Sequence, residues 1–200
     1  MTVDFIPYPK IPRLFRDITI TEKIDGSNAG IQIIEGAHSV YSFYLDGEPY
    51  SVFAQSRKRL ITPDDDNFGF AGWVNTNARL LTRTLGTGTH FGEWWGSGIQ
   101  RNYGFTKGER RFSLFNSKRW APLTGNLEAA AAGLGVVPVL YEGPFVESAI
   151  HQTLNVLRLS GSKAAPGFLP PEGIVIFHQA ARQNFKVLLE NDELPKGLLY

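Results

Sequence analysis

The sequence has no cysteine among its 200 residues. This absence excludes disulfide bonds and thiolate zinc sites, and it agrees with a cytoplasmic location. No run reaches the roughly 18 apolar residues of a membrane span, and the amino terminus lacks the apolar core of a signal peptide. We therefore expect a protein with no membrane partner.

The chain also lacks a strong charge of either sign. Its formal net charge is +1, so any binding of nucleic acid has to come from local patches. No Rossmann glycine fingerprint and no Walker A loop is present, so a nucleotide would be bound on another scaffold. The apolar fraction of 42% and the length predict one globular domain, with enough chain to bury a core around a cleft.

Apolar periodicity predicts an α+β fold with largely antiparallel sheets. Strands are expected over 17–23, 29–35, 38–45, 49–54, 89–95, 111–116, 136–141, 173–178 and 185–190, and helices over about 70–85, 127–132 and 147–158. Asp46-Gly47 predicts a hairpin turn. The three aspartates at 64–66 are interpreted as a helix cap rather than a metal cage. The proline-rich residues 1–16 are expected to lie extended against the domain.

The stretch 21–30 (TEKIDGSNAG) contains the main candidate site. On a strand, Lys23 and Asp25 project from the same face. Gly26 has access to backbone angles that other residues avoid, and it lets a phosphate approach the main chain. A lysine held among fixed polar groups is a candidate amine nucleophile. Taken alone, the same pattern also describes a surface lysine in an Asp-Gly turn.

Other candidates lie further along the chain. Arg57 belongs to a run of three cations that attracts anions, and it is equally typical of a solvated loop end. Glu93 stands between a glycine and two tryptophans, and Glu172 begins an otherwise apolar strand; both carboxylates are costly there unless they are paired or functional. Arg101 and Tyr103 combine a cation with an aromatic ring and suggest an RNA contact. A further patch consists of Arg110, Arg111, Lys118 and Arg119 with phenylalanines between them.

The segment Glu-Lys-Ile-Asp-Gly-Ser-Asn at 22–28 resembles the nucleotidyl-acceptor motif of the covalent nucleotidyltransferases, which include ATP-dependent RNA and DNA ligases and mRNA capping enzymes. With the lead-in Tyr8-Pro9-Lys10-Ile11-Pro12-Arg13, the chain is most similar to the RNA-ligase-2-like branch. The resemblance implies a ligase adenylation domain, ATP-grasp-like, with antiparallel sheets flanking a nucleotide cleft. It covers nearly the whole chain, from Lys10 to Lys186.

The resemblance also implies roles for individual residues. Lys23 would attack the α-phosphate of ATP and carry AMP, with Lys186 beside that phosphate. The implied nucleotide-binding residues are Glu22, Asp25, Gly26, Asn28, Arg57, Glu93, Phe115, Glu172 and Lys186. Glu172 and Glu93 would bind Mg²⁺ or Mn²⁺, ions that prefer hard oxygen ligands. Two positions depart from the family pattern: Asn116 replaces an expected acid, and Asn184 replaces the first of two expected lysines.

The function implied is ATP-dependent RNA ligation through a lysyl-AMP intermediate. AMP would pass to a 5′-phosphate and a 3′-hydroxyl would seal the strand, with RNA ends, including nicked duplex, as partners. We expect residues 1–200 to form one domain without an OB-fold or a carboxyl-terminal accessory domain, so an oligomer or a helper protein is a further expectation. The alternatives are a DNA-joining ligase, a GTP-using capping enzyme and a non-catalytic nucleic-acid-binding module of the same fold.

Overall fold

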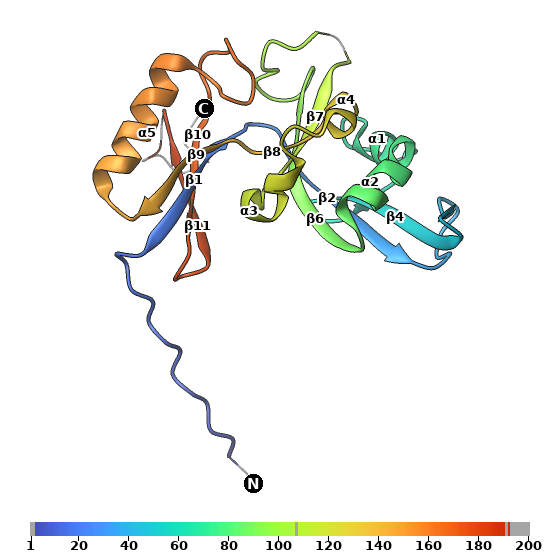
Figure 1. The fold of residues 1–200 in the computed structure, drawn as a ribbon, viewed down its shortest axis with the longest axis horizontal. Helices are drawn as coiled ribbons and strands as arrows, with labels where there is room; N and C mark the ends of the chain where they lie inside the picture. The colour runs from blue at the N-terminus through green and yellow to red at the C-terminus, as the bar shows by residue number, and fades with distance from the viewer. Residues whose placement is uncertain (1–2, 107, 191, 193–200) are drawn as a thin grey trace.

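The computed structural model describes residues 3–106, 108–190 and 192, which form two sheets (Figure 1). The smaller sheet is antiparallel, in the order β11-β10-β1-β9. Its strands are β1 (Asp17–Lys23), β9 (Val139–Pro144), β10 (Gly173–His178) and β11 (Gln183–Leu188). Helix α5 (Glu147–Ser160) covers one of its faces.

The larger sheet has the order β3-β4-β2-β6-β7-β8, with β5 paired to β4. Its strands are β2 (Ser27–Glu35), β3 (Phe43–Leu45), β4 (Glu48–Ser56), β5 (Leu60–Ile61), β6 (Gly88–Gly96), β7 (Arg110–Leu114) and β8 (Leu134–Val136). The remaining helices are α1 (Phe70–Thr76), α2 (Ala78–Leu85), α3 (Ser117–Trp120), α4 (Leu127–Ala131) and the 3₁₀ turn η1 (Ala121–Leu123). Every described strand pair is antiparallel except β7 with β8, which confirms the predicted α+β class.

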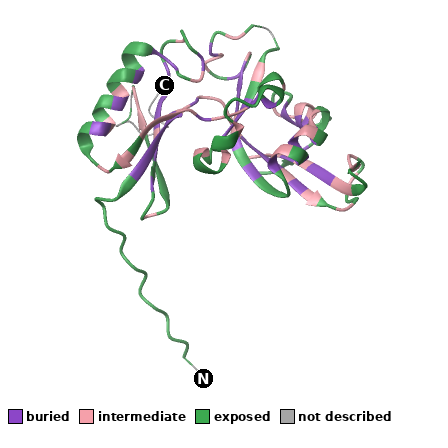
Figure 2. Cartoon of the chain, viewed as in Figure 1, coloured by how far each residue is buried: buried purple, intermediate pink, exposed green. Residues whose placement is uncertain are grey.

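The alternation along β1 decides which side chains enter the core. Ile18 and Ile20 are fully buried and belong to the cluster with Leu157 of α5. Because side chains alternate along a strand, Thr19, Thr21 and Lys23 project from the opposite face. In Figure 2 the buried residues concentrate along the strands of both sheets. The sequence pattern therefore leaves one face of the small sheet free for a site.

Several predicted elements have different boundaries in the structure. The expected helix over 70–85 is two helices, because Asn77 departs from helical angles (φ −101°, ψ 11°) and its Nδ2 donates to the carbonyl oxygen of Trp73 at 2.8 Å. The expected strand over 136–141 is split between β8 and β9, which belong to different sheets. The Asp46-Gly47 hairpin is confirmed, with φ of 52° and 90° at its two residues.

The interpretation of the aspartate run as a helix cap is confirmed for Asp66. Its carboxylate accepts hydrogen bonds from the backbone N–H groups of Ala71 (2.7 Å) and Gly72 (2.9 Å), in the first turn of α1. The residue at the N-cap position itself is Gly69. Asp66 therefore caps the helix from three residues before the N-cap position, by accepting from first-turn N–H groups that have no partner within the helix.

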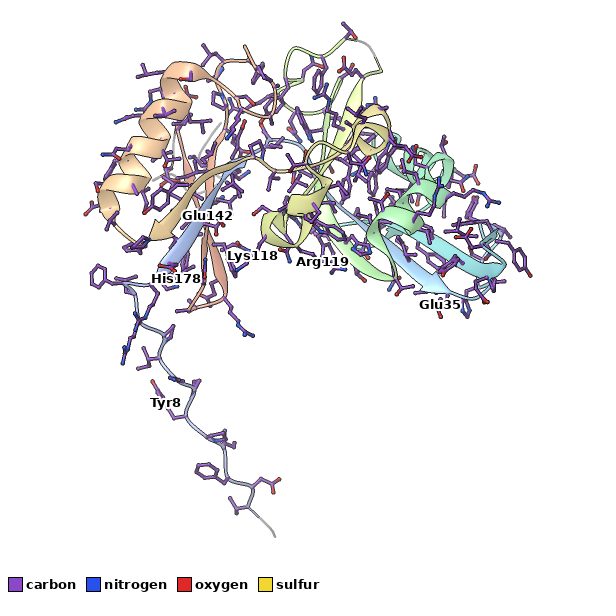
Figure 3. The ribbon with its side chains drawn as sticks, viewed as in Figure 1. Tyr8, Glu35, Lys118, Arg119, Glu142 and His178 are labelled. Atoms are coloured by element: carbon purple, nitrogen blue, oxygen red, sulfur yellow. The ribbon has the colours of Figure 1, made fainter. Side chains whose placement is uncertain are left out.

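Residues 3–13 do not lie against the domain, contrary to the expectation from the sequence. The segment is exposed throughout and runs away from both sheets (Figure 1), and Tyr8 points into solvent in Figure 3. The chain meets the domain at the next residue, Leu14, whose carbonyl oxygen accepts a hydrogen bond from the Nε2 of His178 at 2.6 Å. The Nδ1 of His178 accepts from the N–H of Ala181. Among the described residues, no helix combines the length and apolarity that crossing a membrane requires.

Candidate active site

A cleft of about 860 Å³ separates the free face of the small sheet from the larger sheet. Its lining residues come from both sheets and from α3. From the small sheet come Thr19, Thr21, Lys23, Val175, Phe177, Asn184 and Lys186, and from the other side Asn28, Arg57, Glu93, Phe115, Asn116 and Lys118. The volume lies in the range of small-molecule sites.

Lys23 is the last residue of β1, and Glu172 directly precedes the neighbouring strand β10. Because β1 and β10 are antiparallel and pair Lys23 with Gly173, the two side chains emerge at the same end of the sheet. The Nζ of Lys23 lies 2.5 Å from Oε2 of Glu172. Burial raises the pKa of the Glu172 carboxyl, although the ion pair with Lys23 acts in the opposite direction.

Glu93 lies across the cleft on β6, where it is the register partner of Asn28. Its carboxylate accepts a hydrogen bond from the backbone N–H of Gly26 at 3.1 Å. Burial raises the pKa of Glu93 from 4.5 to about 7, against the lowering effects of Lys23 and of the Gly26 N–H. The negative charges of Glu172 and Asp25 add to the rise. Three acids therefore share the surroundings of a single lysine.

Gly26 is required by close packing. A Cβ at this position would lie 2.5 Å from the carbonyl oxygen of Trp94 and 2.9 Å from the Cβ of Trp95. Its φ is not in the positive range where the backbone freedom of glycine is needed. The reason expected from the sequence, unusual backbone angles, is therefore wrong. The glycine lets the chain pass against β6 as it crosses from one sheet to the other.

Glu22 points away from Lys23, toward the loop that follows α5. Its side chain is buried and accepts hydrogen bonds from the Ser162 hydroxyl (2.5 Å) and from the backbone N–H groups of Lys163 (2.8 Å) and Ala164 (2.9 Å). Glu22 is among the residues that line the cleft, although its carboxylate is engaged by this loop. Its predicted contact with the nucleotide stays a prediction.

Asp25 lies just beyond β1 and is held by two contacts. Its Oδ2 accepts from the Nε of Arg101 at 3.0 Å, and its backbone N–H donates to the Tyr103 hydroxyl at 2.7 Å. Tyr103 is buried, so its ring is not available to stack on a base. The RNA contact suggested for Tyr103 by the sequence is therefore wrong.

Besides Lys23, four cations line the cleft: Arg57, Lys118, Arg182 and Lys186. All four are exposed, and within the described part of the chain none has a carboxylate partner within 4.0 Å. They come from both sides, since Lys118 is on α3 (Figure 3) and Arg182 is in the turn between β10 and β11. Arg182 lies outside the motifs, and only the tertiary structure brings it to the cleft.

The predicted basic patch around β7 is only partly assembled at the cleft. Lys118 lines it, whereas the Arg110 guanidinium donates to the carbonyl oxygens of Phe68 and Ser97. Arg111 pairs with Glu109, and Arg119 lies over the ring of Trp120. Arg110, Arg111 and Arg119 therefore make local contacts, and of the four predicted cations Lys118 is the one that lines the cleft.

Phe115 and Asn116 lie in the cleft directly after β7. Phe115 is 40% exposed, so its ring is available to a planar ligand. The Oδ1 of Asn116 accepts from the N–H of Arg119 at 3.1 Å and caps α3. Asn116 therefore has a structural role at the position where the family pattern expects an acid.

The donor set fits a magnesium or manganese ion that also binds phosphates. Glu172 and Glu93 offer hard oxygen ligands, and such ions need only one or two carboxylates when a nucleotide supplies the rest. The described residues include no group of three His, Cys, Asp or Glu side chains placed to hold a metal by themselves. An ion here would depend on the nucleotide for part of its coordination shell.

Comparison with known proteins agrees with this geometry. A sequence model of the RNA ligase family matches residues 16–188, whereas no curated protein matches the chain significantly. Solved structures of a Naegleria gruberi RNA ligase share the fold. A variant with AMP and Mn has a TM-score of 0.56 at 19% identity and covers 88% of this chain and 50% of that chain. A variant with ATP and Mn has a TM-score of 0.55 at 18% identity, covering 88% and 51%.

This chain therefore spans about half the length of the solved structures that it matches. The family model, by contrast, extends over most of the present sequence, from β1 through the end of β11. The matched range includes Lys23, Glu93, Glu172 and Lys186. This chain belongs to the RNA ligase family.

Proposed function

We propose that this chain is an ATP-dependent RNA ligase module that acts through a covalent lysyl-AMP intermediate on Lys23. The observation that carries the proposal is the placement of Lys23 in a nucleotide-sized cleft, in contact with the Glu172 carboxylate and opposite Glu93. The structural relatives of the same fold include RNA ligase variants with ATP, AMP and Mn.

An amine attacks only in its neutral form, so Lys23 must release a proton first. Glu172 is the acceptor within hydrogen-bond distance, and its raised pKa makes it a stronger base than an ordinary carboxylate. The nitrogen then forms a bond to the α-phosphorus while the bond to the bridging oxygen breaks and pyrophosphate leaves. One proton of the Lys23 ammonium passes to Glu172 before the attack, and the second is released to solvent as the N–P bond forms.

Residues that line the cleft, together with Glu172 and Asp25 beside Lys23, would hold the nucleotide. A divalent ion bound by the phosphates with Glu172 or Glu93 would neutralise phosphate charge. Lys186 lies on β11, one strand beyond Val175, on the cleft face, where its cation would offset charge at the α-phosphate. Phe115 would stack on the base, and Asn28 and Asp25 would orient the ribose side. We propose Arg57 as a phosphate contact.

The exposed cations support a polyanionic second substrate. Arg57, Lys118 and Arg182 surround the cleft without acidic partners among the described residues, although the net charge of the chain is only +1. A strand of RNA seated there would present its 5′-phosphate to the lysyl-AMP. AMP transfer to that phosphate and attack by a 3′-hydroxyl would complete ligation.

The test is intact-mass analysis after incubation with ATP and Mg²⁺. We expect an AMP-sized increment on the wild type, and none on Lys23→Ala or Lys23→Arg. The protein is first treated with pyrophosphate so that any AMP already bound is removed. The proposal fails if the wild type gains no mass under these conditions while it still binds RNA, a result that would support the non-catalytic module.

A second experiment separates the RNA, DNA and GTP alternatives. The adenylated wild type is given nicked RNA, nicked DNA and single-stranded RNA, and the sealed product is measured. We expect sealing of RNA ends. Faster sealing of nicked DNA would support the DNA-joining alternative, and a GMP-sized increment with GTP in competition with ATP would support a capping enzyme.

A further inference from the structure

The loop between β6 and β7 has an unusual backbone near the active site. Gln100, Asn102 and Tyr103 have φ of 42°, 61° and 51°, in the left-handed region that side chains other than glycine seldom adopt. Each such residue costs roughly 1 kcal/mol or more and persists only when its surroundings hold it. Here the Oδ1 of Asn102 accepts from the N–H of Gly98, and the side chain of Ile99 is fully buried. Because this backbone is unfavourable, we expect contacts near the active site that the bend makes possible.

Arg101 lies within this bend, and its side chain contacts both segments that flank the reactive pair. Its Nε donates to Oδ2 of Asp25 at 3.0 Å, and its Nη1 donates to the carbonyl oxygen of Pro170 at 3.2 Å. Asp25 follows Lys23 by two residues, and Pro170 precedes Glu172 by two. One guanidinium therefore joins the two segments that carry the reactive pair.

Tyr103 holds the same two segments from the other end of the bend. Its hydroxyl accepts from the N–H of Asp25, and its ring packs on Phe168 with centroids 4.6 Å apart and on Trp95 at 5.0 Å. Lys23 ends β1 and Glu172 directly precedes β10, both in the small sheet, whereas Arg101 and Tyr103 follow β6 of the larger sheet. The contacts therefore fix the reactive pair relative to the sheet that carries Glu93.

We infer that Arg101 is a positioning residue for Lys23 and Glu172, acting through Asp25 and Pro170. This inference rests on the proposed lysyl-AMP chemistry. The planar fork of arginine suits two acceptors at once, whereas the point charge of a lysine does not. Displacement of reacting groups by about 1 Å is enough to cost on the order of 100-fold in rate.

The first experiment measures single-turnover adenylation of wild type, Arg101→Ala and Arg101→Lys by intact mass. We expect Arg101→Ala to lower the rate constant by about 10- to 100-fold, with the ATP concentration at half-maximal rate changed less than threefold. Guanidinium ion at low millimolar concentration should restore part of the rate, and sodium chloride at equal ionic strength should not. Arg111→Ala, which removes from β7 an ion pair with Glu109 and a contact with the Phe105 ring but none with Asp25 or Pro170, is the matched control.

The second experiment does not depend on ligase activity. Lys23 is labelled with an amine-reactive ester, and its labelling rate is compared with that of Lys58 by peptide mass spectrometry. Because the contact with Glu172 protects Lys23, we expect Arg101→Ala and Glu172→Ala both to accelerate labelling of Lys23 severalfold, and Arg111→Ala to leave it unchanged.

The two readouts separate the proposals. A wild type that is never adenylated, but whose Lys23 is deprotected in Arg101→Ala, overturns the proposed function and keeps the positioning role. An Arg101→Ala protein with normal adenylation and normal Lys23 labelling overturns the positioning role. Loss of RNA binding with both readouts unchanged also overturns it, and makes Arg101 an RNA contact.

Discussion

Lys23 and Glu172 are 149 residues apart in sequence, and their side chains meet at 2.5 Å because β1 and β10 are antiparallel neighbours. The contact holds the amine in place, but the lysine must give up its proton before it reacts. Both requirements concern Glu172, which holds the amine and can accept its proton.

Glu172→Gln keeps the size of the side chain and removes the base. We expect adenylation to fall by at least about 100-fold, the usual scale for loss of a general base. The measurement is the single-turnover rate by intact mass at pH 7.5. The loss should shrink at high pH, where solvent removes the lysine proton. A pH-independent loss would indicate that Glu172 acts only as a metal ligand.

Glu93 leads to a prediction about stability and pH. Its pKa is about 7 in the folded protein and 4.5 ordinarily, so the folded state holds the proton more tightly than the unfolded chain. The free energy of unfolding therefore falls as pH rises from 4.5 to 7, and stays lower above pH 7. Glu93→Gln removes this penalty, so we expect it to stabilise the protein by about 1–3 kcal/mol at pH 8.5 relative to its effect at pH 5.

Thermal unfolding of wild type and variant at the two pH values tests this expectation. Glu35→Gln is the control, because Glu35 is exposed at the far end of the same sheet (Figure 3). Equal effects of Glu93→Gln at both pH values would contradict the burial of an ionisable carboxyl at this position.

A substitution of Glu22 tests whether this motif residue binds the nucleotide or stabilises the fold. Glu22→Gln replaces a buried charge that has three donors, and we expect it to lower the free energy of unfolding by about 2 kcal/mol. Amide hydrogen exchange should accelerate at Lys163 and Ala164, because their N–H groups then donate to a neutral amide oxygen, a weaker acceptor than the carboxylate. Ser162→Ala should show a smaller loss of the same kind. An ATP requirement raised tenfold with normal stability would instead support direct nucleotide contact.

The cations Lys118 and Arg182 test the path of the RNA strand. Replacing both with alanine should weaken RNA binding and reduce the slope of log K against log[salt] by about 1.4, since each contact with single-stranded nucleic acid contributes about 0.7. Adenylation by ATP should change less than about twofold. Arg83→Ala is the control, because Arg83 pairs with Glu128 away from the cleft. An unchanged salt slope would place the strand elsewhere.

Much of the fold follows from local pattern. The alternation in β1, the Asp46-Gly47 turn and the helical spacing of α5 each depend on neighbours in sequence, and the structure confirms them. The crossing between β8 and β9 is misplaced because pairing with strands distant in sequence decides it. The Asn77 break between α1 and α2 is local, since the Asn77 side chain bonds the Trp73 carbonyl oxygen four residues earlier, and apolar periodicity does not register such a bond.

The sequence by itself determined the α+β class, the family and the order of the motifs, because periodicity and motif spacing are local properties. Only the tertiary structure decided what each motif residue contacts. It turned the Glu22 carboxylate toward the 162–164 loop, gave Gly26 a steric reason in place of a conformational one, and brought Arg101 to Asp25. These contacts join segments distant in sequence, and no pattern within one segment encodes the position of the other.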